Sequence, residues 1–126
     1  MAEISQHIER KVAVMDQNKT ALDAAKMMTE RFIGSVVVTE SQDVKGIFTE
    51  RDLTRILGTG RNPADVRVKE MVAPMRVTVS SHETVERCLE LMKNNKCRHL
   101  LVFDGAEFVG LVSLRDLVML MLEEKE

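Results

Sequence analysis

Apolar residues follow helical and strand spacing in the same order in both halves of the chain. They recur at i, i+3, i+4 and i+7 over residues 21–28 and again over residues 85–92, which predicts two helices with one buried face each. A short run rich in apolar residues follows each helix, SVVVTE at 35–40 and HLLVFD at 99–104, and predicts a buried strand. Each run leads through a polar turn into a second apolar run, so a hairpin is expected in both halves.

Both halves end in one octet, GIFTERDL at 46–53 and GLVSLRDL at 110–117, and a helix is expected from there to about residue 57 or 122. A shift of 64 residues aligns the halves without a gap and gives seven identities over residues 20–53. The chain is therefore an internal duplication.

The repeated pattern predicts an α/β (α+β) fold of two pseudo-symmetric units, each running strand, helix, strand, strand, helix. One repeat of about 55 residues is too small to cover its own sheet, so the two sheets are expected to pack together with their helices outside. The predicted division is 1–60 for the first repeat with the N-terminal segment and 61–126 for the second repeat with the linker. Gly58, Gly60 and Pro63 mark that linker.

Composition narrows the class of protein. Hydrophobic residues make up 44% and charged residues 30%, with a net charge of −2, as in a soluble globular chain without pull toward nucleic acid or membrane. No apolar run approaches the roughly 20 residues that span a bilayer. The N-terminus does not have the composition of a secretory signal, and two cysteines make no disulfide framework, so a cytoplasmic location is expected.

The octet places a hydroxyl residue three positions before an acid at a strand-to-helix junction. Thr49 and Asp52 occupy these positions in the first copy, and Ser113 and Asp116 in the second. One interpretation is a helix N-cap with its N3 partner, which is a common local device.

The same positions suit a ligand. A helix N-terminus can receive a phosphate, the hydroxyl can donate to it, and the acid one turn on can accept from ribose hydroxyls. Arg51 and Arg115 add positive charge nearby. The spacing alone leaves capping and binding both open.

The duplication, the element order and the motif G-h-h-[ST]-x-x-D (h apolar) resemble the cystathionine-β-synthase (CBS) domain in its usual tandem pair. The resemblance covers about residues 11–122. It implies that Thr49, Asp52, Ser113 and Asp116 contact the phosphate and ribose of an adenine nucleotide of the AMP, ADP, ATP or NAD class, bound between the repeats.

The two expected sites differ in their surroundings. The first has Gly34, Ser35 and Glu50 where the second has Arg98, His99 and Leu114. Gly34 would let a ligand approach the backbone. Arg98 and Arg115 are expected to make the second site the better one for a di- or triphosphate.

Neither a metal site nor a catalytic site is expected. Cys97 and His99 suggest a metal, but Cys88 and Cys97 align with the apolar residues Ala24 and Ile33, and no second Cys/His pair has zinc spacing. No set of nucleophile, base and orienting residue is recognised, so the chain is not expected to be an enzyme.

The last helix is apolar nearly all round, which predicts that one side is buried by a second chain. The resemblance also implies a homodimer. The expected function is a stand-alone sensor that binds an adenosine-containing ligand and signals to a separate effector protein. The alternative is a ligand-free dimerisation or interaction module in which the motif residues only cap helices.

Overall fold

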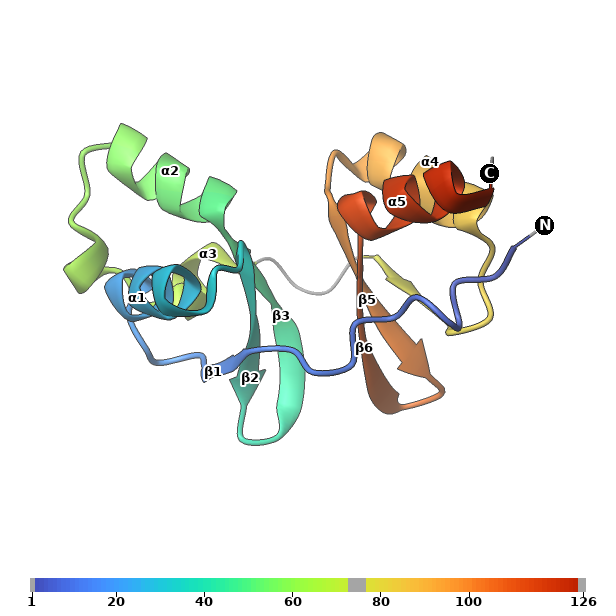
Figure 1. Ribbon diagram of the computed structural model, residues 1–126. Coiled ribbons are helices and arrows are strands. Elements are labelled where there is room, and N and C mark those ends of the chain that lie inside the picture. The colour runs from blue at the N-terminus through green and yellow to red at the C-terminus, as the bar shows by residue number, and fades with distance from the viewer. Residues whose placement is uncertain (1, 73–76, 125–126) are drawn as a thin grey trace. The chain divides into compact units, whose positions relative to one another are not determined.

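The computed structural model describes residues 2–72 and 77–124 (Figure 1). The chain divides into two compact units. The first-repeat unit is Ala13–Met75, and the second-repeat unit combines Met1–Val12 with Arg76–Glu126.

The first-repeat unit is a three-stranded sheet with helices. Its elements are β1 (Val14–Asp16), α1 (Ala21–Arg31), β2 (Ser35–Glu40), β3 (Asp43–Thr49), α2 (Glu50–Gly58), the 3-10 turn η1 (Pro63–Asp65) and α3 (Val68–Met71). The strand order is β1-β2-β3, with β1 parallel and β3 antiparallel to β2.

The second-repeat unit repeats this plan. Its elements are β4 (Thr78–Val79), α4 (Val85–Asn95), β5 (His99–Asp104), β6 (Glu107–Ser113) and α5 (Leu114–Glu124). The strand order is β4-β5-β6 with the same directions. The mixed α/β class and the two repeated units predicted from the sequence are thereby confirmed.

The 64-residue duplication is visible in the strand register. Ser35 pairs with Thr49 and His99 with Ser113, and both hairpins shift register at the same place, after Val38 and after Val102. This register places each hydroxyl residue of the octet at the end of its strand, directly before a helix.

Each core lies between a helix face and its sheet. The buried positions of α1 and α4 are Ala21, Ala24, Met28 and Val85, Cys88, Met92, which are the positions that the periodicity marks. They pack with the buried residues of the central strand, such as Val36 in the first-repeat unit and Leu100 in the second.

The segment that precedes each repeat packs on the other repeat. Ile4 and Val68, 64 residues apart, are both fully buried, Ile4 in the core of the second-repeat unit and Val68 in that of the first. The backbone bonds have the same offset: Ile4 N–Glu83 O 2.9 Å and Val85 N–Ala2 O 2.9 Å correspond to Val68 N–Lys19 O 2.8 Å and Ala21 N–Val66 O 2.7 Å. The N-terminal segment (residues 2–12) therefore lies in the second-repeat unit, whereas the sequence division grouped it with the first repeat.

The far end of the N-terminal segment is joined to β6. The N–H of Glu9 donates to the carbonyl oxygen of Leu111 (2.8 Å), and the N–H of Leu111 donates back (2.9 Å). Gly110 permits this approach, because a Cβ at that position would lie 2.3 Å from the carbonyl oxygen of Glu9. The glycine of the second octet is thus required by packing.

Candidate functional site

The hydroxyl and the acid of the second octet form a reciprocal capping box at the start of α5. The N–H of Ser113 donates to Asp116 Oδ2 (3.3 Å), and the N–H of Asp116 donates to Ser113 Oγ (3.1 Å). The motif therefore caps the helix, as one of the two interpretations predicted, and the cap uses one of the two carboxylate oxygens of Asp116.

The first octet makes a tighter version at the start of α2. The N–H of Thr49 donates to Asp52 Oδ2 (2.9 Å), and the Thr49 hydroxyl lies 3.2 Å from the same oxygen. Arg55 Nη1 lies 3.5 Å from Asp52 Oδ1. Asp52 is only 9% exposed, whereas Asp116 is half-buried, so the two carboxylates are not equivalent.

The first N–H group of each helix is also bonded within the protein. The N–H of Glu50 donates to the carbonyl oxygen of Gly34 (3.1 Å), and the N–H of Leu114 donates to that of Arg98 (2.8 Å). At the start of α5, the capping box and this backbone bond together satisfy three N–H donors, those of Ser113, Leu114 and Asp116. Few donors therefore remain there for an anion.

Gly34 lies beside Glu50, which the sequence grouped with it at the first expected site. A Cβ at Gly34 would lie 2.8 Å from Glu50 Oε1, so the side chain of Glu50 lies against this glycine. The space that a ligand was expected to use is therefore next to a carboxylate.

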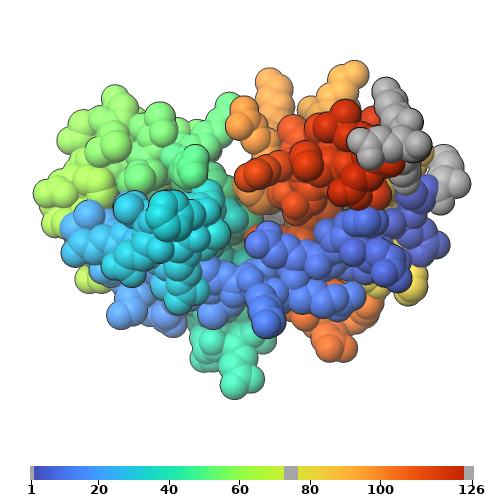
Figure 2. All heavy atoms as spheres, in the orientation of Figure 1, coloured from blue at the N-terminus to red at the C-terminus, as the bar shows by residue number. Residues whose placement is uncertain are grey.

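A cavity lies beside Asp116 in the second-repeat unit, between the N-terminal segment and α5. Its volume is about 420 Å³, within the range of small-molecule sites. The lining residues are His7, Ile8 and Glu9 from the segment and Asp116, Met119, Leu120 and Glu123 from α5. In Figure 2 the segment (dark blue) runs alongside α5 (red). We call this space the α5 cavity.

Glu9 is a site residue that the sequence did not reveal. Partial burial and, next, the negative charge of Asp116 raise the pKa of the Glu9 carboxyl. Glu9 is 107 positions before Asp116 and belongs to no motif. Only the contact of the N-terminal segment with the second repeat brings the two carboxylates together.

The other predicted site residues surround the two helix starts without joining the lining of the α5 cavity. Arg51, Arg98 and Arg115 are exposed. Ser35 and His99 begin β2 and β5 and are half-buried. The lining of the α5 cavity therefore contains three carboxylates, one histidine and three apolar side chains, and none of the three arginines.

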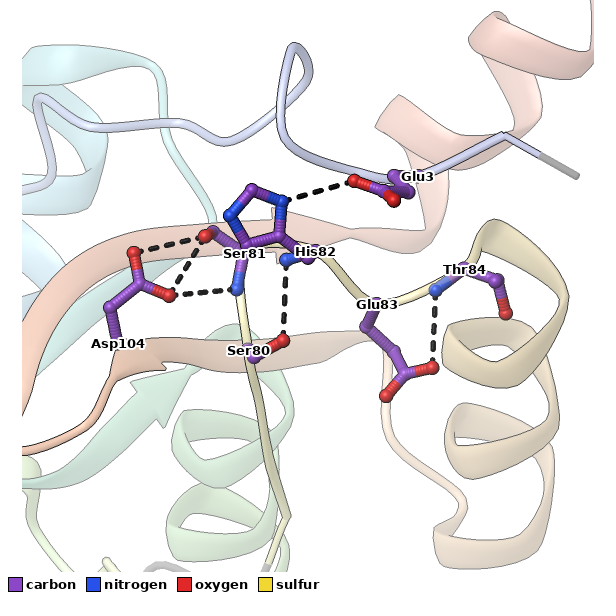
Figure 3. Close-up of polar contacts among 7 residues, drawn as sticks. All are labelled: Glu3, Ser80, Ser81, His82, Glu83, Thr84 and Asp104. Atoms are coloured by element: carbon purple, nitrogen blue, oxygen red, sulfur yellow. Dashed lines mark hydrogen bonds and ion pairs between the residues drawn. The ribbon is translucent and has the colours of Figure 1, made fainter.

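The turn before α4 contains serine, histidine and acid side chains in close contact (Figure 3). The hydroxyl of Ser81 donates to Asp104 Oδ1 (2.8 Å), and the N–H of Ser81 donates to the same oxygen (3.2 Å). Both bonds lower the pKa of the Asp104 carboxyl. His82 Nδ1 instead lies 3.1 Å from Glu3 Oε1. Ser81 thus connects the turn to Asp104 of β5, and His82 connects it to Glu3 of the N-terminal segment.

Cys88 is a core residue, as its alignment with an apolar position predicted, and Cys97 is half-buried against the same core. Cys88 is buried, and burial raises the pKa of its thiol to about 11, while burial also raises the pKa of Cys97. Both are free thiols. Within residues 2–72 and 77–124, His, Cys, Asp and Glu side chains do not gather in groups of three or more that would suit a metal ion.

Among the described helices, none combines the length and the apolar character needed to cross a membrane.

The fold identifies the class of protein to which the chain belongs. It has two repeats, and each contains a parallel strand pair, an antiparallel strand pair and a capped helix after the last strand. The family model of the CBS domain matches the chain twice, at residues 3–59 and 68–123. The chain belongs to the CBS domain family, as a tandem pair of the sort that serves as a regulatory module.

Individual relatives agree with this. A putative signal-transduction protein with CBS domains from Burkholderia ambifaria has the same fold, with a TM-score of 0.93 and 30% identity, and the match covers 99% of this chain and 97% of that one. The CBS domain-containing protein YhcV of Bacillus subtilis is 28% identical over 94% of this chain and 85% of its own length.

The CBS domain-containing protein CBSX3, mitochondrial, of Arabidopsis thaliana is 34% identical over 83% of this chain. The match spans 54% of that protein's length.

Proposed function

We propose that this protein is a regulatory module that binds an adenosine-containing ligand through Asp52 and Asp116 and passes the binding event to a partner protein, without a catalytic step of its own. The observation that carries the proposal is the α5 cavity, because Asp116 of the repeated motif lines it. The free thiols fit a reducing compartment such as the cytoplasm.

Capping and binding are compatible at Asp116. The capping box uses Oδ2, and a carboxylate has a second oxygen with its own lone pairs. That second oxygen can accept a hydrogen bond from a ribose hydroxyl while the cap remains intact. Asp52 is the poorer candidate of the two, since Arg55 lies beside its Oδ1.

A thermal-shift panel of adenosine, AMP, ADP, ATP and NAD tests the proposal. A ligand at about 100 times its dissociation constant adds roughly 2.7 kcal/mol to the free energy of unfolding. The chain has no Trp or Tyr, so an added dye must report unfolding. The absence of a shift with every ligand at millimolar concentration would contradict the proposal.

The substitutions Asp116→Asn and Asp52→Asn separate binding from capping. Each keeps the side-chain shape and an oxygen for the cap, but it removes charge-assisted hydrogen bonds to a ligand, and affinity should fall at least about tenfold. Asp23→Asn is the matched control. Asp23 closes a capping box with Thr20 at α1 (3.0 Å each way) but lies outside the octet, so it should leave affinity unchanged.

The second candidate is a ligand-free interaction module. It is favoured by the apolar residues that α5 exposes outside the α5 cavity, Val118, Met121 and Leu122 at 43%, 42% and 56%. In either case we propose that a second copy of the chain covers these residues, giving a homodimer, because a monomer would leave the patch in water.

A further inference from the structure

The α5 cavity has an apolar wall and an acidic rim. Ile8, Met119 and Leu120 form the wall. On α5, Leu120 follows Asp116 by four residues and Glu123 follows Leu120 by three. The three side chains therefore share one face of the helix. The rim therefore carries three carboxylates, Glu9 from the N-terminal segment and two from α5, against the single imidazole of His7.

Such a rim discriminates between ligands by charge. Carboxylates only accept hydrogen bonds, so they suit hydroxyl and amino groups. A phosphate in the same space would meet the like charges of Glu9, Asp116 and Glu123, and the repulsion grows as water is excluded. Glu9 and Asp116 both line the cavity, and after burial the negative charge of Asp116 is the second cause that raises the pKa of Glu9.

The start of α5 does not offset this repulsion. The N–H groups of Ser113, Leu114 and Asp116 donate to protein oxygens. Arg98 and Arg115 are exposed and are not among the residues that line the cavity. A phosphate would therefore lose water without gaining a full set of donors.

We infer that the α5 cavity selects an adenosine-class ligand that carries no phosphate, a neutral or cationic nucleoside, and that Glu9 is the residue that enforces this choice. The inference rests on the proposed function, in which Asp116 binds the ligand. It reverses the expectation, drawn from Arg98 and Arg115, that this site prefers polyphosphates.

Each part of the cavity has a role in this scheme. The apolar side chains of Ile8, Met119 and Leu120 cover the faces of the base. Asp116 accepts from the ribose hydroxyls, and Glu9 accepts from a further hydroxyl or amino donor. Glu9 is held in place by its backbone, which pairs with Leu111, so its side chain can be changed without moving the segment.

The test compares adenosine with AMP by calorimetric titration. The Asp52→Asn chain is used, so that the heat reports the Asp116 site. We expect adenosine to bind about tenfold more tightly than AMP, which corresponds to about 1.4 kcal/mol, and Glu9→Gln to reduce the ratio to about threefold or less by strengthening AMP binding.

Glu3→Gln is the matched control. Glu3 lies in the same N-terminal segment, and its substitution removes the same charge as Glu9→Gln. Its carboxylate, however, lies 3.1 Å from His82 Nδ1 and does not line the cavity. It should leave the ratio of the two affinities as in the parent chain. A thermal melt of each variant without ligand checks that it is folded.

The outcomes separate this inference from the proposed function. Binding that Asp116→Asn weakens, with a ratio that Glu9→Gln leaves unchanged, would overturn the role of Glu9 and keep the nucleoside site. Tighter binding of AMP than of adenosine would overturn the selection itself. If neither ligand binds, or if Asp116→Asn has no effect on binding, the proposed function fails and this inference fails with it.

Discussion

Glu9 shows how much one side chain depends on a neighbour far away in the sequence. Burial and the carboxylate of Asp116 both raise its pKa, which means that the folded state favours the protonated form. A group with a raised folded pKa contributes its stability below its unfolded pKa and loses it as the pH rises through the folded pKa. At neutral pH the ionised pair is therefore a destabilising contact.

The substitution Glu9→Gln should thus stabilise the protein at pH 7. The gain should be below about 1 kcal/mol, because solvent screens a carboxylate that is largely exposed. It should shrink as the pH falls through the raised pKa of Glu9 and be largely lost at about pH 4, where the wild-type carboxyl is protonated as well. Urea unfolding curves at pH 7 and pH 4 measure this, and a gain that is larger at pH 4 would contradict it.

Gly110→Ala should destabilise the second-repeat unit. The new Cβ would lie 2.3 Å from the carbonyl oxygen of Glu9 and 2.9 Å from a side-chain carbon of Ile8, so the N-terminal segment has to move. Such overpacking costs typically about 1–3 kcal/mol. Thermal unfolding measures the loss. Gly58→Ala is the control, since a Cβ there meets nothing within 4 Å; an equal loss in both variants would show that the close approach is unimportant.

At the residue scale, the sequence predicted what is local. The spacing of Ser113 and Asp116 predicted a cap, and the structure has one. Glu9 could not be predicted, because its role arises from a contact across 107 positions. Glu50 differs in this respect, since the sequence already grouped it with Gly34 at the first expected site, and its side chain lies against that glycine.

Helices and strands were predicted almost at their observed positions, because their periodicity records which side is buried. The runs at 35–40 and 99–104 are β2 and β5, and the expected final helices are α2 and α5. The N-terminal segment was harder to place. It forms isolated bridges at Glu3 and Glu9 in place of a continuous strand, so its apolar residues follow no period that could be detected.

Helix α5 has more apolar surface than its own unit covers. Leu117 and Leu120 are buried, whereas Val118, Met119, Met121 and Leu122 are 43%, 50%, 42% and 56% exposed. A helix with this pattern on two sides is typical of a subunit interface.

Leu122→Lys should therefore convert a dimer into monomers, because a charge would be placed in an apolar contact. Sedimentation velocity at tens of micromolar measures the state of association. Val14→Lys is the control, since Val14 is as exposed, at 53%, but lies on β1. If the wild-type chain itself sediments as a monomer, the interface on α5 does not exist.

At the scale of the whole molecule, the two repeats exchange their leading segments. Ile4 completes the core that contains Cys88, and Val68 completes the core that contains Ala24. Each repeat thus depends on residues that precede the other one in the chain.

Two matched substitutions test this exchange. Ile4→Ala should cost about 2–5 kcal/mol locally and speed amide hydrogen exchange in α4. Val68→Ala should do so in α1, with a smaller effect because less volume is removed. Hydrogen–deuterium exchange with peptide resolution distinguishes the two helices. If Ile4→Ala accelerated exchange in α1 and spared α4, the assignment of the segments to the two units would be wrong.

The exchange of leading segments also decides what the linker is for. A chain cut between residues 60 and 61 would give two fragments, each holding the sheet of one core and the closing segment of the other. Neither fragment could complete a core alone, and the two would have to find each other in solution at the cost of their free translation. The covalent link replaces that encounter with a high effective concentration, so each repeat acts as a tethered folding partner of the other.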